Sequence, residues 1–177
     1  MIVAFHDTAA VAGPGTRFGE PAQVLAPALD NFATLRARLP GQAPRLDALE
    51  AWTRAEFART EPTLAARKAG SRIRECHGDL HLGNLVLLDS QVCPFDCIEF
   101  SDELRWIDVA SELAFTYMDL LDHRRPDLAA WLLDAWLRES GDFQAVPVLR
   151  FYSVYKALVR AKVAALGGTS AQATDYL

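Results

Sequence analysis

The stretch that decides the fold is His77-Gly78-Asp79-Leu80-His81-Leu82-Gly83-Asn84. It places a carboxylate and a carboxamide five residues apart on a short loop, at Asp79 and Asn84. Two short apolar segments, 86–88 and 92–95, follow on either side of an Asp-Ser pair and predict a β-hairpin. Asp96 comes directly after the second segment. Such a hairpin would bring Asn84 and Asp96 to one cavity.

These side chains suit phosphoryl transfer from a nucleotide. A carboxylate such as Asp79 can orient a hydroxyl group and take its proton. Mg²⁺ neutralises and orients nucleotide phosphates and prefers oxygen ligands, and here Asp96 offers a carboxylate and Asn84 a neutral oxygen. The order and spacing of the three residues resemble those of protein kinases. We therefore expect ATP, or another nucleoside triphosphate, and Mg²⁺ as cofactors, with a small hydroxyl-bearing compound as the acceptor.

The identities of the residues in this loop are more specific to one family than their spacing is. His-Gly-Asp-x-His-x-x-Asn resembles the aminoglycoside phosphotransferase family, a branch of the protein-kinase-like fold. Residues 95–100 and 105–115 resemble the metal-binding segment of that family and the helix after it. The run Asp-Cys-Ile-Glu-Phe is similar to a bacterial subgroup in which the kinase-like region often precedes a P-loop ATPase domain. The resemblance is strongest from residue 75 to residue 121.

The resemblance implies a role for each residue of the loop. Asp79 matches the catalytic base, and Asn84 and Asp96 match the metal ligands. His77 matches a position that keeps the loop in shape, and His81 stands where the family often has His. On the residues alone, Asp79 could instead be a turn residue that bonds nearby amides. The two histidines could also bind a metal, because His-x-Asp-x-His can converge on one ion.

Three further residues flank the predicted site. Asp108 matches an aspartate at a helix start that braces the catalytic loop without touching substrate. Arg105 is expected to pair with a nearby acid rather than to clamp a phosphate. Glu99 either lines the acceptor cleft or is a solvated carboxylate at the end of the hairpin. The sequence favours neither interpretation of Glu99.

Hydrophobic periodicity predicts a mainly helical (α+β) domain, the C-terminal lobe of the protein-kinase-like fold, with one short β-hairpin that carries the active site. Trp131 and Trp136 have helical spacing, so both are expected to pack in the core. Pro62 is expected to open a helical segment of its own. Helices are expected over residues 25–39, from 46 onward, 62–70, 108–121, 128–136 and 148–166.

A complete kinase also has an N-terminal lobe with a sheet, a glycine-rich loop and a strand lysine. Only 76 residues precede His77, and Lys68 is the one lysine among them. We therefore interpret residues 1–177 as a single domain, the C-terminal lobe alone, with the N-terminal lobe absent. The missing lobe or a fused domain is the expected partner. The apolar surface left uncovered would favour self-association into a homo-oligomer.

Composition excludes several classes of protein. The net charge is −5 and there is no Lys/Arg-rich block, so nucleic-acid binding is not indicated. No apolar run is long enough for a transmembrane helix, and the first residues do not form a signal peptide. Three cysteines make no disulfide framework, which favours the cytoplasm. Cys93 and Cys97 lack the paired spacing of a structural zinc site.

Three functions remain open on the sequence. The first is a metal-dependent small-molecule kinase, for which this chain supplies the base and the metal ligands. The second is a catalytically silent binding or assembly module, because the nucleotide-clamping lobe is missing. The third is a metal-dependent hydrolase, which uses the same Asp and His residues but leaves the spacing of Asn84 unexplained. The sequence does not identify the acceptor.

Overall fold

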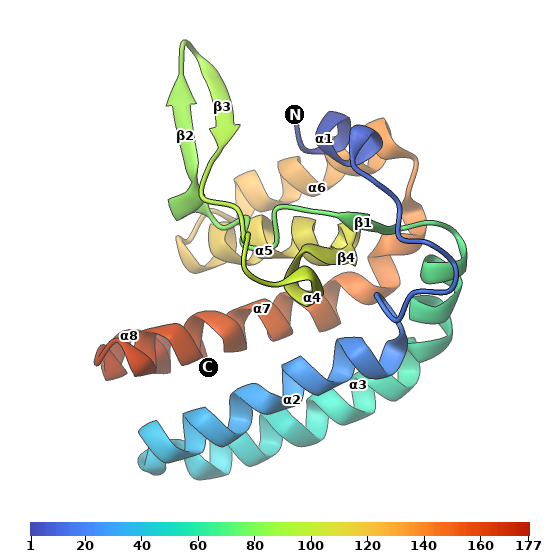
Figure 1. Cartoon of the computed structure of the whole chain (residues 1–177). Helices are drawn as coiled ribbons and strands as arrows, with labels where there is room; N and C mark the ends of the chain where they lie inside the picture. Colours follow the sequence, from blue (N-terminus) through green and yellow to red (C-terminus); the bar gives the residue numbers. More distant parts are fainter.

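The computed structural model describes residues 1–177 and confirms a mainly helical fold with one short β-hairpin (Figure 1). Its helices and strands follow in this order: α1 (Ile2–Thr8), α2 (Pro21–Arg38), α3 (Ala43–Ala69), β1 (Ile73–Glu75), β2 (Leu85–Leu88), β3 (Gln91–Pro94), α4 (Asp102–Arg105), β4 (Trp106–Asp108), α5 (Val109–Asp122), α6 (Pro126–Ser140), α7 (Val146–Leu166) and α8 (Ser170–Asp175). Three short 3₁₀ turns lie between them: η1 (Pro40–Gln42), η2 (Leu82–Asn84) and η3 (Phe143–Ala145).

Helix α7 is the centre of the helical packing. It contacts α5 on one side and the antiparallel pair α2 and α3 on another, while α6 packs on α5 (Figure 1). The larger hydrophobic cluster fills the space among α5, α6 and α7 and includes Leu113, Phe151 and Tyr152. A second cluster, with Phe32 and Leu158, joins α2, α7 and the C-terminal residues. The core therefore supports α5, the helix that lies beneath the predicted catalytic loop.

Two sequence expectations about the helices are wrong. Residues 43–69 form one helix, α3, with Pro62 in its interior rather than at the start of a new segment. A proline inside a helix removes one backbone hydrogen bond, but α3 packs along both α2 and α7, and this packing keeps it continuous. Trp136 is buried as expected, whereas Trp131 is 67% exposed.

The strands form two separate antiparallel pairs. The predicted hairpin is β2 with β3, in the register Leu85↔Pro94 to Leu88↔Gln91. Asp89 and Ser90 both have positive φ, as the tight two-residue turns of hairpins require. The second pair, β1 with β4, was not predicted, because each strand has only three residues. The catalytic loop follows β1 and α5 follows β4. The pairing of these strands therefore places the loop beside the start of α5.

The segment before β1 is helical. It contains α1, α2 and α3, and its only β-contact is an isolated bridge from Val11 to Arg74 in β1. None of the helices combines the length and the apolar character needed to cross a bilayer.

Candidate active site

The loop between β1 and β2 brings Asp79 and Asn84 into contact. The Nδ2 group of Asn84 donates hydrogen bonds to the Asp79 carbonyl at 2.9 Å and to its carboxylate Oδ2 at 3.1 Å. Both donors of this amide group are therefore used within the loop. The Oδ1 atom of Asn84 accepts no hydrogen bond from the protein, so it is free to bind a cation. This is the oxygen that a hard metal ion would need.

His81 borders the carboxylate of Asp79. The amide of Gly83 donates to Nδ1 of His81 at 3.0 Å, so the ring proton is on Nε2. Nε2 lies 3.5 Å from Oδ2 of Asp79, whose side chain is 37% exposed. Burial alone would raise the pKa of Asp79, but His81, Lys156 and Arg160 together hold this pKa below its usual value. Asp79 is therefore an ionised acceptor at neutral pH.

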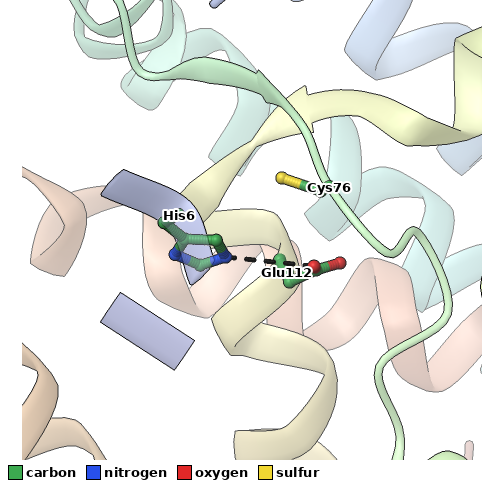
Figure 2. A group of neighbouring side chains, drawn as sticks. All are labelled: His6, Cys76 and Glu112. Carbon is green, nitrogen blue, oxygen red and sulfur yellow. Dashed lines mark ion pairs between the residues drawn. The ribbon is translucent and has the colours of Figure 1, made fainter. Parts of the chain in front are cut away.

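Glu112 of α5 holds the start of the loop. Its two oxygens accept hydrogen bonds from the amides of His77 at 2.7 Å and Gly78 at 2.9 Å. Glu112 is fully buried, which opposes its charge, but His6 and the two amides hold its pKa below the usual value. The ring of His6 lies 3.9 Å from this carboxylate, and Cys76 completes a buried group around it (Figure 2). Because both Glu112 oxygens already accept loop amides, this carboxylate acts as an anchor for the loop.

Two more side chains on the same face of α5 continue this support. The hydroxyl of Thr116 donates to the carbonyl of Leu80 at 2.6 Å, and Asp119 accepts from the amide of Leu82 at 2.8 Å. Glu112, Thr116 and Asp119 were missed in the sequence, although their spacing gives a signal. They recur at four and three residues as a polar stripe on a helix that is otherwise apolar.

The two histidines make contacts within the protein. Nε2 of His77 lies 2.8 Å from the carbonyl of Phe95, and Nδ1 of His77 accepts from the amide of Asp79 at 3.4 Å. His77 therefore ties the loop to the segment after β3. No group of potential metal ligands contains His77 or His81, and none contains Cys93 or Cys97. The structure therefore does not add support to the alternative of a metal-bound His-x-Asp-x-His arrangement, nor to a zinc site at Cys93 and Cys97, which the sequence already disfavoured.

Asp96 lies on the segment that these contacts hold. On one side of it, Phe95 donates its amide to the Asn84 carbonyl at 3.0 Å, and on the other Ile98 donates to the His77 carbonyl at 3.0 Å. The Asp96 side chain is exposed, and its φ of 59° is unusual for a residue other than glycine. No hydrogen bond or ion pair joins the Asp96 side chain to Asp79 or to Asn84, so the convergence of these three residues on a metal stays a prediction. A strained backbone held from both sides is typical of functional positions.

Asp108 supports the site through α5 rather than by touching the loop. Its carboxylate caps α5 by accepting from the amide of Ala110 at 2.8 Å. It also receives two hydrogen bonds of 2.7 Å from Arg67, which is fully buried and pairs in addition with Asp142 at 2.8 Å. Burial opposes the charge of Arg67, yet the two carboxylates raise its pKa. This buried network fixes the start of α5, where the catalytic loop is anchored.

The remaining predicted residues lie at the edge of the site. Arg105 pairs with Glu75 at 2.7 Å, the acid partner expected for it. Glu99 is exposed and makes no hydrogen bond or ion pair, so its role stays undecided. Two cations on α7, Lys156 and Arg160, were missed, although Lys156 is a charge at a core-facing position of an apolar helix.

The comparisons with known proteins define the class of this chain. The chain matches the profile of the phosphotransferase enzyme family over residues 1–152, and it belongs to that family. It is also 38% identical over 103 residues to proteins of Mycobacterium bovis and of two strains of Mycobacterium tuberculosis, each named only as an uncharacterized protein. The matched stretch covers 58% of this chain and 21% of each relative. No solved structure matches the chain significantly.

Proposed function

We propose that this chain is the acceptor-side lobe of an ATP- and Mg²⁺-dependent kinase that phosphorylates a hydroxyl group of a small molecule. The observation that carries the proposal is the contact between Asp79 and Asn84. It keeps the carboxylate oriented while it leaves Oδ1 of Asn84 free for a cation. In a member of the phosphotransferase enzyme family, this pairing is what a catalytic base beside a metal ligand requires.

Each residue has a distinct proposed task. Asp79, ionised at neutral pH, would accept the proton of the substrate hydroxyl, while His81 donates toward it and fixes its position. Asn84 and Asp96 would hold Mg²⁺, which neutralises the phosphates of the bound nucleotide. His77 and Glu112 would keep the loop in the shape that places these groups together.

The complete enzyme would add a lobe that clamps the nucleotide. Residues 1–72 provide three helices and no glycine-rich loop on a sheet. The hairpin also exposes Leu87 and Leu88, at 69% and 55%. Apolar side chains at this exposure favour a covering partner. We therefore expect weak binding of Mg²⁺-nucleotide and slow turnover by residues 1–177 alone.

The experiment measures nucleotide consumption over a panel of hydroxyl acceptors, for this chain and for a longer protein that adds the nucleotide-binding lobe. In the longer protein, Asp79→Asn should lower kcat by about 10² to 10⁴, since it removes a general base. Asp96→Ala should weaken the binding of Mg²⁺-nucleotide in calorimetry. Asp89→Asn, in the turn of the hairpin, is the matched control and should change neither quantity.

The silent-module alternative has support in the exposed apolar groove that contains Trp131, Leu128 and Val92. A longer protein that consumes no nucleotide with any acceptor, but binds a partner through this groove, would favour the alternative. Rapid turnover by residues 1–177 alone would contradict the need for a second lobe.

A further inference from the structure

Three potential metal ligands meet in the interior of the protein, next to the start of the catalytic loop. His6 comes from α1, Cys76 directly follows β1, and Glu112 lies on α5 (Figure 2). All three residues are at most 4% exposed. One ligand atom from each lies within 4.8 Å of the other two, and Nε2 of His6 lies 3.9 Å from Oε1 of Glu112. An imidazole, a thiol and a carboxylate therefore converge on one buried point.

The ring of His6 has no hydrogen bond. Its Nδ1 and Nε2 atoms are both buried, and neither has a partner in the protein. A neutral imidazole carries one donor and one acceptor, and a protonated ring carries two donors, so every form of His6 leaves polar atoms unsatisfied. Burial without a partner is costly for such a group. An ion pair with Glu112 would not remove this cost, because 3.9 Å is too long for a hydrogen bond and Nδ1 would still be unpaired.

The other two side chains can still act as ligands. Each oxygen of Glu112 accepts one loop amide, and a carboxylate offers about four lone-pair positions, so each oxygen can accept once more. The thiol of Cys76 makes only a weak hydrogen bond, with 3.6 Å from its sulfur to the carbonyl oxygen of Ile107. Because the thiolate is the form that binds metals, the thiol proton would pass to solvent on binding. Glu112 can therefore anchor the loop and bind an ion at the same time.

The backbone around these three side chains is held in place. Arg74 donates to the carbonyl of His6 at 2.6 Å, and the amide of Cys76 donates to the carbonyl of Arg105 at 2.8 Å. A tetrahedral zinc ion, with bonds of about 2.0–2.3 Å, separates neighbouring ligand atoms by about 3.4–3.6 Å. The observed separations exceed these values by roughly an ångström or less, which small side-chain rotations can supply.

The ligand types favour a particular class of metal. A thiolate, an imidazole and a carboxylate are ligands of Zn²⁺, whereas Mg²⁺ prefers oxygen ligands alone. The group therefore differs in chemistry from the predicted magnesium ligands Asn84 and Asp96. Cys76 borders a hollow of about 460 Å³ whose lining includes the exposed Cys97, so the hollow reaches solvent. Through it an ion could reach the sulfur of Cys76, and water could supply a fourth ligand.

We propose that His6, Cys76 and Glu112 bind one Zn²⁺ ion that supports the catalytic loop. The ion would give a ring nitrogen of His6 the partner that the protein does not provide. It would also tie α1 and the end of β1 to α5, beside His77, where the loop begins. The site is independent of the proposed kinase function, since it needs neither nucleotide nor acceptor.

The test is a titration of residues 1–177, metal-free and reduced, with Co²⁺, which replaces Zn²⁺ in such sites and is coloured. Co²⁺ bound by a thiolate shows an absorption band from charge transfer out of sulfur. We expect this band to saturate at one equivalent, to disappear on addition of Zn²⁺ and to persist in excess Mg²⁺. Cys76→Ser should abolish the band. Cys76→Ser and His6→Gln should each weaken binding about tenfold or more, since even residues that only support metal ligands typically contribute roughly 10–100-fold.

Two matched controls should leave the band and the affinity unchanged. Cys97→Ser removes an exposed thiol that borders the same hollow. His123→Gln removes a member of a second group of potential ligands, formed with Asp119 and Asp122. A measurement on the wild type needs no variant, because the NMR signals of the His6 ring should shift when Zn²⁺ is added.

Several results would overturn the proposal. These are the absence of a saturable band, a band that survives Cys76→Ser, an equal loss in either control variant, and signals of the His6 ring that do not respond to Zn²⁺. Circular dichroism verifies that each variant is folded, and the wild-type NMR result decides the question if a variant is not.

Discussion

The substitution Glu112→Gln tests whether α5 anchors the catalytic loop. The carboxylate accepts from two loop amides, and hydrogen bonds to a charged group contribute about 1.5–3 kcal/mol each, against about 0.5–1.5 for neutral ones. Glutamine removes the charge and turns an amide NH₂ group toward one of the two N–H donors, which leaves that donor unpaired. We expect a loss of about 2–4 kcal/mol in the free energy of unfolding, and at roughly 2–4 °C per kcal/mol a fall in Tm of about 4–16 °C.

The assay combines urea unfolding at several pH values with hydrogen exchange at the amides of His77 and Gly78. The pKa of Glu112 is lower in the folded state than the ordinary pKa of a glutamate side chain. Its charge therefore stabilises the fold above that pH, and this stability is lost as pH falls through the folded pKa. The difference in the free energy of unfolding between wild type and variant should be largest at pH 7 and should shrink below about pH 4.5. Glu61→Gln, an exposed and unpaired position on α3, is the control. A variant as stable as wild type at pH 7, with unchanged exchange at both amides, would refute the anchoring role.

Two further predictions concern the frame of the site. Arg67→Met should lower the free energy of unfolding by about 3–5 kcal/mol, because it leaves two buried carboxylates without their cation. Arg54→Met, on an exposed ion pair, is the control and should lower it by less than about 1 kcal/mol. Equal effects of the two substitutions in thermal unfolding would contradict the role of the buried network. Gly78→Ala should cost about 1–3 kcal/mol and disturb the loop, because Gly78 has a φ of 89° and an added Cβ would lie 2.7 Å from the Leu104 carbonyl oxygen; a fully stable variant with an unchanged spectrum around Asp79 would argue against this backbone constraint.

The sequence predicted the features that depend on local patterns. The helices around α5, α6 and α7 follow apolar periodicity, and the hairpin follows its two-residue turn at Asp89 and Ser90. The contact of Asp79 with Asn84 follows from their place on one short loop. These features need only neighbouring residues to be recognised.

The rest depends on contacts between distant segments, which local patterns do not show. Pro62 favours a helix start by itself, and only packing along two helices keeps it inside α3. Lys156 is far from Asp79 in sequence, and the packing of α7 on α5 brings its charge to the site. The pairing of β1 with β4 likewise joins segments more than thirty residues apart.

The central claim is that Asn84 and Asp96 hold the metal of a bound nucleotide beside Asp79. Mn²⁺ binds the same oxygen ligands as Mg²⁺ and broadens the NMR signals of nearby nuclei. The most direct measurement is therefore a titration of residues 1–177 with Mn²⁺ and ATP, followed at every resolved amide. Asp96→Ala serves as the matched variant.

The account predicts that broadening begins at the side-chain amide of Asn84 and at the backbone amides of residues 95–98. In Asp96→Ala, the same broadening should require several-fold more Mn²⁺–ATP. A different cluster of potential ligands, formed by Asp119, Asp122 and His123, offers the contrasting site. Broadening centred on that cluster, with the signals of Asn84 unchanged and no effect of Asp96→Ala, would contradict the account.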